Sequence, residues 1–226
     1  MKKLAVVCTI FGLLLFANPY FSPAQEPSVI KLPPPQKDGG MPLMKALSLR
    51  QSTRGNFGPA EKLSMQTLSN LLWAADGVNR PNAAQPERGH RTAPSAVDWQ
   101  NIDIYVTTPD GLFLYDPIKH ELKVLGKEDV RGVAGTQDFV PTAPLNLIYV
   151  ADLAKASFQG KKMDTAEPWS WAGVGFIAQN VYLFCASENL ACIIRAMFDA
   201  NAVIKTLKLR PDQKPLLAQT VAQFKK

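Results

Sequence analysis

An almost uninterrupted apolar stretch occupies residues 172–187 of this 226-residue chain. It contains no charged residue and is long enough for four turns of helix. A helix that is apolar on all sides must be covered on all sides, and a single small domain offers only limited cover. The sequence therefore predicts a central helix at 172–187, with a homodimer interface as one way to cover it.

The segments around this helix alternate between helical and strand patterns. Helices are predicted at 42–50, at 64–76 with Ser64 as its cap, and at 199–207 with Asp199 as its cap. Strand patterns occupy 102–106, 112–115, 122–125, 145–150 and 215–221. Residues 77–100 are rich in turn residues, and a loop of that length is commonly functional or disordered. The mixture predicts an α+β fold.

The first 24 residues have the layout of a secretory signal peptide. Lys2 and Lys3 precede a mostly apolar run at 5–17, and small residues at 22–24 follow a polar stretch. The run is short for a membrane span, which takes about 20 apolar residues. We expect an exported protein, periplasmic or extracellular, without stable membrane insertion after cleavage; an uncleaved anchor is the alternative. Residues 25–40 are proline-rich and predict a linker or an arm, and residues 41–226 form one domain.

Several function classes are disfavoured by what the chain contains. Its formal charge of +6 is spread along the sequence, which does not suit a nucleic-acid binder. The two histidines lie 30 residues apart, so no metal site is expected. Cys185 and Cys192 would be two turns apart on one helix, too far for a disulfide, so buried thiols are favoured unless the helix breaks between them. No motif identifies a catalytic residue.

Three segments have residues suited to an anion or a flat ring. Arg50, Ser52 and Arg54 fall at alternate positions, where guanidinium and hydroxyl groups suit a phosphate. Residues 91–101 combine small residues with polar ones that could line a planar ligand. Gly175 lies inside the apolar helix, where glycine costs about 1 kcal/mol relative to alanine and often has a packing or ligand reason.

The order of these segments resembles that of the nitroreductase-like flavoproteins, in particular the short branch related to SagB/ThcOx-type dehydrogenases. The matching segments run through most of the chain: RQSTR at 50–54, LLWAADG at 71–77, RTAPSA at 91–96, the strand meander at 101–116, EDVRG at 128–132, APLNLIYVAD at 143–152, GFIAQNVYL at 175–183 and PLLAQTV at 215–221. The resemblance implies a three-layer α/β/α sandwich with a mainly antiparallel sheet, an intertwined homodimer, and FMN at the dimer interface.

The resemblance also implies roles for individual residues. Arg50, Ser52 and Arg54 match the phosphate-binding RxSxR, and Arg195 is a further candidate phosphate contact. The loop along the flavin ring is matched by Pro94, Ser95 and Ala96, followed by Asp98 and Gln100 at its polar positions. Gly175 matches a glycine near the redox-active nitrogen, while Gln179 and Asn180 are expected to support the site. Asp98 stands where the family commonly has asparagine, and an ionised aspartate only accepts hydrogen bonds.

The implied activity is an FMN-dependent oxidoreductase with ping-pong electron transfer to a small acceptor. The cofactor carries the chemistry and the protein binds and orients it, which suits a chain without an evident acid–base pair. The donor would be NAD(P)H or, outside the cytoplasm, another reductant such as a protein or a quinone. The alternative is a flavin-binding or carrier protein of the same fold without turnover.

Overall fold

The structure is a computed structural model that describes residues 28–55, 57–58, 61–82, 84–85 and 88–225. Its centre is a seven-stranded sheet in the order β1-β6-β5-β4-β7-β11-β10, in which every neighbouring pair is antiparallel. The strands are β1 (Val29–Lys31), β4 (Ile102–Thr108), β5 (Gly111–Asp116), β6 (Glu121–Gly126), β7 (Leu145–Asp152), β10 (Leu190–Arg195) and β11 (Gln213–Gln223). All five predicted strand segments are confirmed, and the predicted signal peptide at 1–24 lies outside the described residues.

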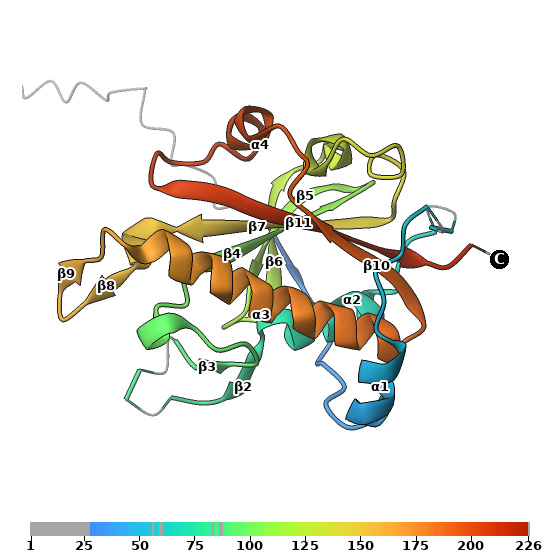
Figure 1. The fold of residues 1–226 in the computed structure, drawn as a ribbon, viewed down its shortest axis with the longest axis horizontal. Helices are drawn as coiled ribbons and strands as arrows, with labels where there is room; N and C mark the ends of the chain where they lie inside the picture. The colour runs from blue at the N-terminus through green and yellow to red at the C-terminus, as the bar shows by residue number, and fades with distance from the viewer. Residues whose placement is uncertain (1–27, 56, 59–60, 83, 86–87, 226) are drawn as a thin grey trace, which may run out of the picture.

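Helices cover both faces of the sheet (Figure 1). One face packs against α2 (Met65–Asp76) and α3 (Ala166–Ser187), with α1 (Leu43–Leu49) beside α3. The other face packs against α4 (Ala200–Leu207) and the 3-10 turn η2 (Arg131–Ala134). Ser64 and Asp199 cap α2 and α4 as expected, each accepting hydrogen bonds from backbone N–H groups of the first turn. The result is the predicted three-layer α+β arrangement.

Helix α3 begins six residues earlier than its apolar pattern predicts and is covered on one side only. Val174 and Val181 are fully buried against the sheet. On the outer side Trp169 is 58% exposed, Trp171 42% and Phe176 47%. Helix α1, beside it, exposes Leu43, Met44, Leu47 and Leu49. A single chain therefore leaves an aromatic and aliphatic surface open along α3 and α1, which we call the α3 face.

The proline-rich segment packs on its own chain over the residues that the structure describes. Strand β1 pairs with β6 at the edge of the sheet. The backbone then crosses α2, where Ser69 donates to the carbonyl of Pro33 and Gln66 donates to that of Pro34. Residues 28–40 therefore extend the domain, where the sequence suggests a linker or an arm reaching elsewhere.

Residues 77–100 contain more structure than their turn-rich composition predicts. They form a short hairpin of β2 (Val78–Arg80) and β3 (His90–Arg91), then the 3-10 turn η1 (Ala96–Asp98). A second hairpin, β8 (Ser157–Phe158) with β9 (Lys161–Lys162), follows the turn η3 (Leu153–Lys155). Among the helices described here, none is long and apolar enough to cross a bilayer.

Candidate functional site

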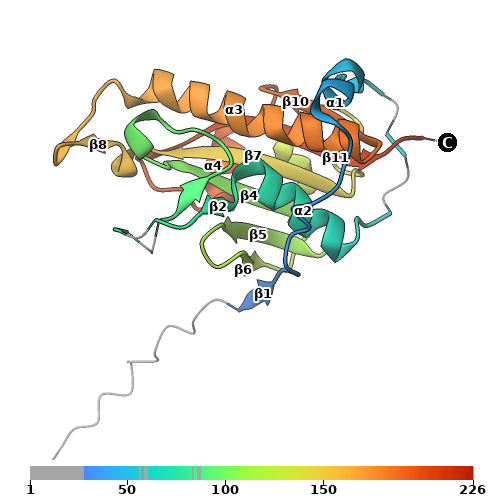
Figure 2. The same cartoon turned by 90° about the horizontal axis from the view of Figure 1, so that it is seen from below.

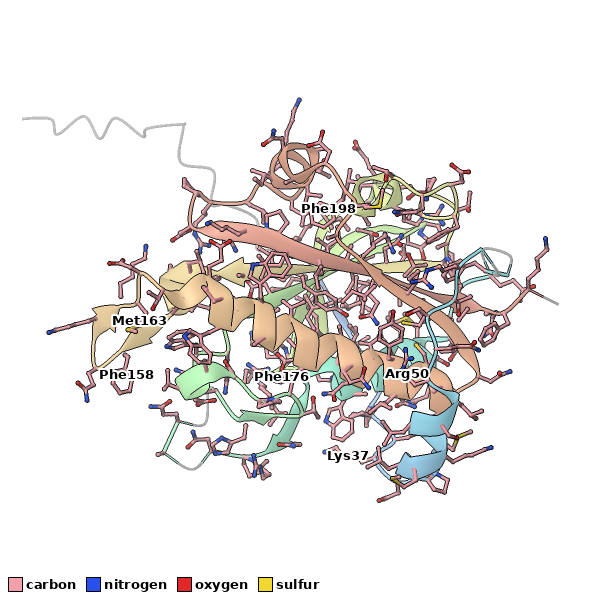
Figure 3. All side chains as sticks on the ribbon, in the orientation of Figure 1. Lys37, Arg50, Phe158, Met163, Phe176 and Phe198 are labelled. Carbon is pink, nitrogen blue, oxygen red and sulfur yellow. The ribbon has the colours of Figure 1, made fainter. Side chains whose placement is uncertain are left out.

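Arg50 and Ser52 meet Tyr182 at one end of α3, a group that we call the Arg50 corner. The Arg50 guanidinium lies 5.4 Å from the centre of the Tyr182 ring, and the Ser52 hydroxyl is 2.9 Å from the Tyr182 hydroxyl. Figure 3 shows Arg50 beside the C-terminal half of α3. Within the described part of the chain, Arg50 has no carboxylate partner. The corner therefore presents an uncompensated cation next to a hydroxyl.

The sheet edge holds this corner in place. Thr53 donates its backbone N–H to the carbonyl of Cys192 at 2.8 Å, and the Tyr182 hydroxyl accepts the backbone N–H of Ile194 at 3.0 Å. Arg54 is exposed, and its side chain has no ion pair among the described residues. Sequence reasoning missed Tyr182, although a tyrosine inside an apolar helix usually finds a hydrogen-bond partner for its hydroxyl.

The 94–100 loop is fastened to the other end of α3. The Trp99 indole donates to the carbonyl of Ser157 at 2.7 Å and packs beside Ala166, the first residue of α3. Next to it, Asn101 donates to the Ser170 hydroxyl at 2.8 Å. Pro94 is exposed, and Ser95 accepts the backbone N–H of Gln100 at 2.9 Å. The loop, including Ala96, is therefore built on a fixed support.

Backbone strain is concentrated in this loop. Val97, Asp98 and Gln100 have positive φ values of 38°, 57° and 52°. Such a conformation is uncommon for residues other than glycine and is an outlier for a β-branched one. It costs on the order of 1–3 kcal/mol per residue and is found most often at active sites and ligand clamps. The strain therefore supports a functional role for 94–100.

Hydrogen bonds fix the polar groups of the loop. The Gln100 amide nitrogen donates to the Asp98 carboxylate at 2.9 Å and to the carbonyl of Gly89 at 2.7 Å. Its oxygen accepts from Arg91 Nε at 3.1 Å. Gln100 thus orients Asp98, whose side chain is 48% exposed and lies 3.8 Å from Arg88. The carboxylate can accept a hydrogen bond from a ligand but cannot donate one.

Gly175 lies between these two groups, on the α3 face. A Cβ built on it would meet no atom within 4 Å, so packing inside this chain does not require glycine there. Gln179 is exposed one turn further along the helix. Asn180 instead points inward and donates to the carbonyl of Ala75 at 3.4 Å.

Arg195 lies apart from the Arg50 corner. It donates to the carbonyl of Ala134, to the Thr220 hydroxyl and to the Asn146 side chain, at 3.1, 2.6 and 2.9 Å. Burial lowers the pKa of this guanidinium to about 10. Side chains alternate along β10, so Arg195 faces the η2 layer while Cys192 faces α3. The structure therefore does not bring Arg195 to the predicted phosphate site; it holds a buried polar network together.

The Arg50 corner and the 94–100 loop lie far apart within one chain. Their contacts on α3, Tyr182 and Ser170, are twelve residues apart, which is about 18 Å along a helix. Gly175 lies between them, on the open side. The three groups share the α3 face, and a second chain on that face could bring a corner and a loop together.

Other chemistry is sparse in the part of the chain that the structure describes. No group of three or more metal-binding side chains is found there. Cys185 and Cys192 are free and buried. Burial and the neighbouring Cys192 raise the pKa of the Cys185 thiol well above its usual range, which keeps it protonated and unreactive.

Comparison with known proteins shows which of them this chain is similar to. The profile of the nitroreductase family matches residues 47–223. A protein of Methanocaldococcus jannaschii that is assigned as a nitroreductase is 31% identical over 172 residues, which are 71% of this chain and 81% of that protein. A crystal structure from Ralstonia eutropha, also assigned as a nitroreductase, is 40% identical with a TM-score of 0.77 and covers 88% of this chain and 90% of its own.

A more distant crystal structure shares the fold alone. It is an assigned nitroreductase of Desulfovibrio desulfuricans in complex with FMN, 17% identical with a TM-score of 0.57, and the match covers 83% of this chain and 89% of that one. The SagB-related branch stays a prediction from the sequence motifs. The extent of the profile match and the two closer relatives nevertheless confirm the resemblance at the level of family: the chain belongs to the nitroreductase family.

Proposed function

We propose that this protein is an exported FMN-dependent oxidoreductase that works by ping-pong transfer between a reductant and a small acceptor. The observation that supports it most is the Arg50 corner, where a cation without a carboxylate partner adjoins a hydroxyl held by Tyr182. A phosphate group takes bidentate hydrogen bonds from a guanidinium and a further one from a hydroxyl. The corner therefore suits the phosphate end of FMN.

The remaining contacts to the cofactor would come from the α3 face. FMN supplies hydride acceptance and electron release when bound, and the protein supplies orientation. Gly175 leaves open surface against which a ring can lie. The strained 94–100 loop would border the ring, with Asp98 as an acceptor at its polar edge. Because about 18 Å of helix separates the corner from the loop, we propose that each site joins the corner of one chain with the loop of a second.

The partners follow from this scheme. The donor would be NAD(P)H or, for an exported protein, a protein or quinone reductant, and the acceptor is a small molecule. Export itself is proposed from the signal-like residues 1–24. The test is to purify the protein, record its flavin absorbance and measure turnover with donor and acceptor. Bound flavin without turnover would favour the carrier function, and absence of flavin binding would contradict both.

Replacing Arg50 with alanine should weaken FMN binding ten- to a hundredfold. A charge-assisted hydrogen bond contributes roughly 1.5–3 kcal/mol, and 1.4 kcal/mol is a factor of ten. Riboflavin has no phosphate, so its affinity should change much less. Titrating both ligands into both proteins by fluorescence quenching separates loss of a phosphate contact from unfolding. Equal weakening of FMN and riboflavin, or no weakening of either, would remove Arg50 from the phosphate site.

Replacing Asp98 with asparagine should raise the reduction potential of bound FMN. An anionic side chain near the ring disfavours the charge that arrives with reduction, and asparagine removes it. The carboxylate is half exposed. Solvent screening therefore leaves about 0.5–1 kcal/mol, or roughly 10–20 mV for two electrons. Asp110→Asn is a matched control, because that carboxylate is also exposed and pairs with Lys62 away from the loop. An unchanged or lower potential in the Asp98 variant would show that Asp98 does not adjoin the ring.

A further inference from the structure

The central sheet splits at one end and encloses a cavity. Strand β4 pairs with β7 from Ile102 onward, but with β5 only from Tyr105 onward. Strand β5 meanwhile continues along β6 as far as Asp116. The two strands therefore part beyond the Tyr105–Leu114 pair, and a cavity of about 520 Å³ opens between them. It is separate from the Arg50 corner and the α3 face, and it shares Gln100 with the 94–100 loop.

Most charged groups around this cavity already have partners. Asp103 pairs with Lys155 at 2.6 Å, Asp116 with Lys123 at 2.9 Å, and Asp152 with Arg210 at 2.9 Å. Within each of these pairs, the two opposite charges neutralise each other at the rim of the cavity. These pairs leave three charged side chains that line the cavity: Lys208, which is exposed, and Asp76 and Arg91, which are the two less exposed ones.

Asp76 is a buried carboxyl group without a partner. It is 8% exposed, and no side chain or backbone donor of the described residues bonds to its carboxylate. It is also the last residue of α2, where the helix dipole disfavours negative charge. Burial and the nearby Asp103 raise its pKa to about 7, against the opposing effect of Arg91 and Lys155. Its carboxylate borders the cavity and has no hydrogen-bond partner among the described residues, so it is available to a ligand.

Arg91 offers the complementary charge beside it. Its Nε donates to Gln100 and its Nη1 donates to the backbone carbonyl of Asp76, at 3.1 and 3.4 Å. Its Nη2 has no acceptor among the described residues, and the guanidinium forms no ion pair with the Asp76 carboxylate in the structure. A carboxyl group and a guanidinium group thus lie side by side, and each can form a further hydrogen bond with a ligand.

The chemistry of such a ligand follows from these two groups and from the walls. A positive and a negative group carried close together on one small molecule would satisfy both side chains at once. The walls add apolar surface from Ile104, Leu114 and Leu125. We propose that this cavity binds a small zwitterion of the α-amino acid class with an apolar side chain, its ammonium group at Asp76 and its carboxylate at Arg91. The proposal does not depend on the flavin site.

The test uses calorimetric titration of the full chain with three related probes. L-Leucine carries both charges, leucinamide lacks the carboxylate, and 4-methylpentanoate lacks the ammonium group. We expect leucine to bind more tightly than either analogue. Arg91→Gln should weaken leucine ten- to a hundredfold and weaken leucinamide less, because only leucine has a carboxylate for Arg91. Asp76→Asn should weaken both leucine and leucinamide ten- to a hundredfold.

Two further variants keep the test decisive. Asp116→Asn is the matched control, because this carboxylate lines the same cavity but is already paired with Lys123, so leucine affinity should change less than twofold. Arg91→Lys keeps the charge and should retain more leucine affinity than Arg91→Gln. Failure of leucine to bind at about 10 mM, equal binding of leucine and 4-methylpentanoate, or an Arg91→Gln effect that is the same for leucine and leucinamide would each overturn the proposal.

Discussion

Replacing Phe176 with aspartate is expected to convert the proposed homodimer into a monomer. Phe176 is 47% exposed and lies at the middle of α3 (Figure 3), on the same helix as the exposed Trp169 and Trp171. An apolar surface of this kind on a soluble domain usually marks an interaction site. In the proposed two-chain assembly a two-fold axis would place Phe176 in the interface twice, so the substitution would remove two buried rings and bury two charges.

The expected effect on dimer affinity is large. Fully burying one large apolar side chain contributes about 1.5–3 kcal/mol, and Phe176 has only about half of its surface left to bury. Two copies therefore contribute roughly 1.5–3 kcal/mol, which corresponds to a dissociation constant raised about ten- to a hundredfold, and the two buried charges add to that effect. Sedimentation over a concentration series would show the shift. Since the proposed site combines two chains, FMN affinity should fall together with dimerisation.

An aspartate on the opposite side of the molecule provides the control. Ile204 is 38% exposed on α4, which covers the other face of the sheet (Figures 1 and 2). Ile204→Asp should leave the sedimentation coefficient unchanged. A wild-type protein that sediments as a folded monomer at micromolar concentration would contradict the dimer and, with it, the two-chain flavin site.

Local sequence signals predicted the elements well where those signals are strong. Ser64 and Asp199 predict the starts of α2 and α4 because their side chains accept hydrogen bonds from the first turn of each helix. The strand meander could be predicted because Pro109-Asp110-Gly111 supplies a turn between two segments in which apolar and polar residues alternate. Six strands were not predicted. Strands β1, β2, β3, β8 and β9 have only two or three residues each and form through pairing with a neighbour, and the six-residue β10 follows directly after the apolar helix.

The candidate site was predictable in part. Arg50 and Ser52 are brought together because they follow the end of α1 on a segment that Thr53 fastens to β10 by a backbone hydrogen bond. Arg195 could have been placed on the other face from the alternation of side chains in β10, since only Cys192 and its alternate neighbours face α3. The unpaired state of Asp76 could not be read from the sequence. There it marks only the end of a helix, and its burial depends on strands more than 25 residues away.

Replacing Asp76 with asparagine is expected to stabilise the protein at alkaline pH and to change its pH dependence. The pKa of this carboxyl is about 7 in the folded protein, against an ordinary value of 3.8. Between these values the folded state binds more protons than the unfolded state, so wild-type stability falls as pH rises from about 4 to about 7. At pH 8 the buried carboxylate then costs up to about 4 kcal/mol, since one pKa unit corresponds to about 1.4 kcal/mol.

Urea unfolding of both proteins at pH 5 and pH 8 measures this effect. Other titrating groups are common to both, so the stability difference between variant and wild type should grow by about 3 kcal/mol between these two pH values. Asp116→Asn is instead expected to destabilise the protein by about the same amount at pH 5 and at pH 8, because both pH values lie above the ordinary pKa of the carboxyl group. Hydrogen bonds from Lys123 and the 118–119 backbone lower the pKa of Asp116, so its carboxylate stabilises the fold above its ordinary pKa and that stability is lost as pH falls. Parallel pH profiles for wild type and the Asp76 variant would mean that Asp76 is solvated or paired in the folded protein. A ligand for the cavity would explain why the protein keeps a carboxyl group that destabilises its own fold, because binding sites commonly reduce stability in favour of function.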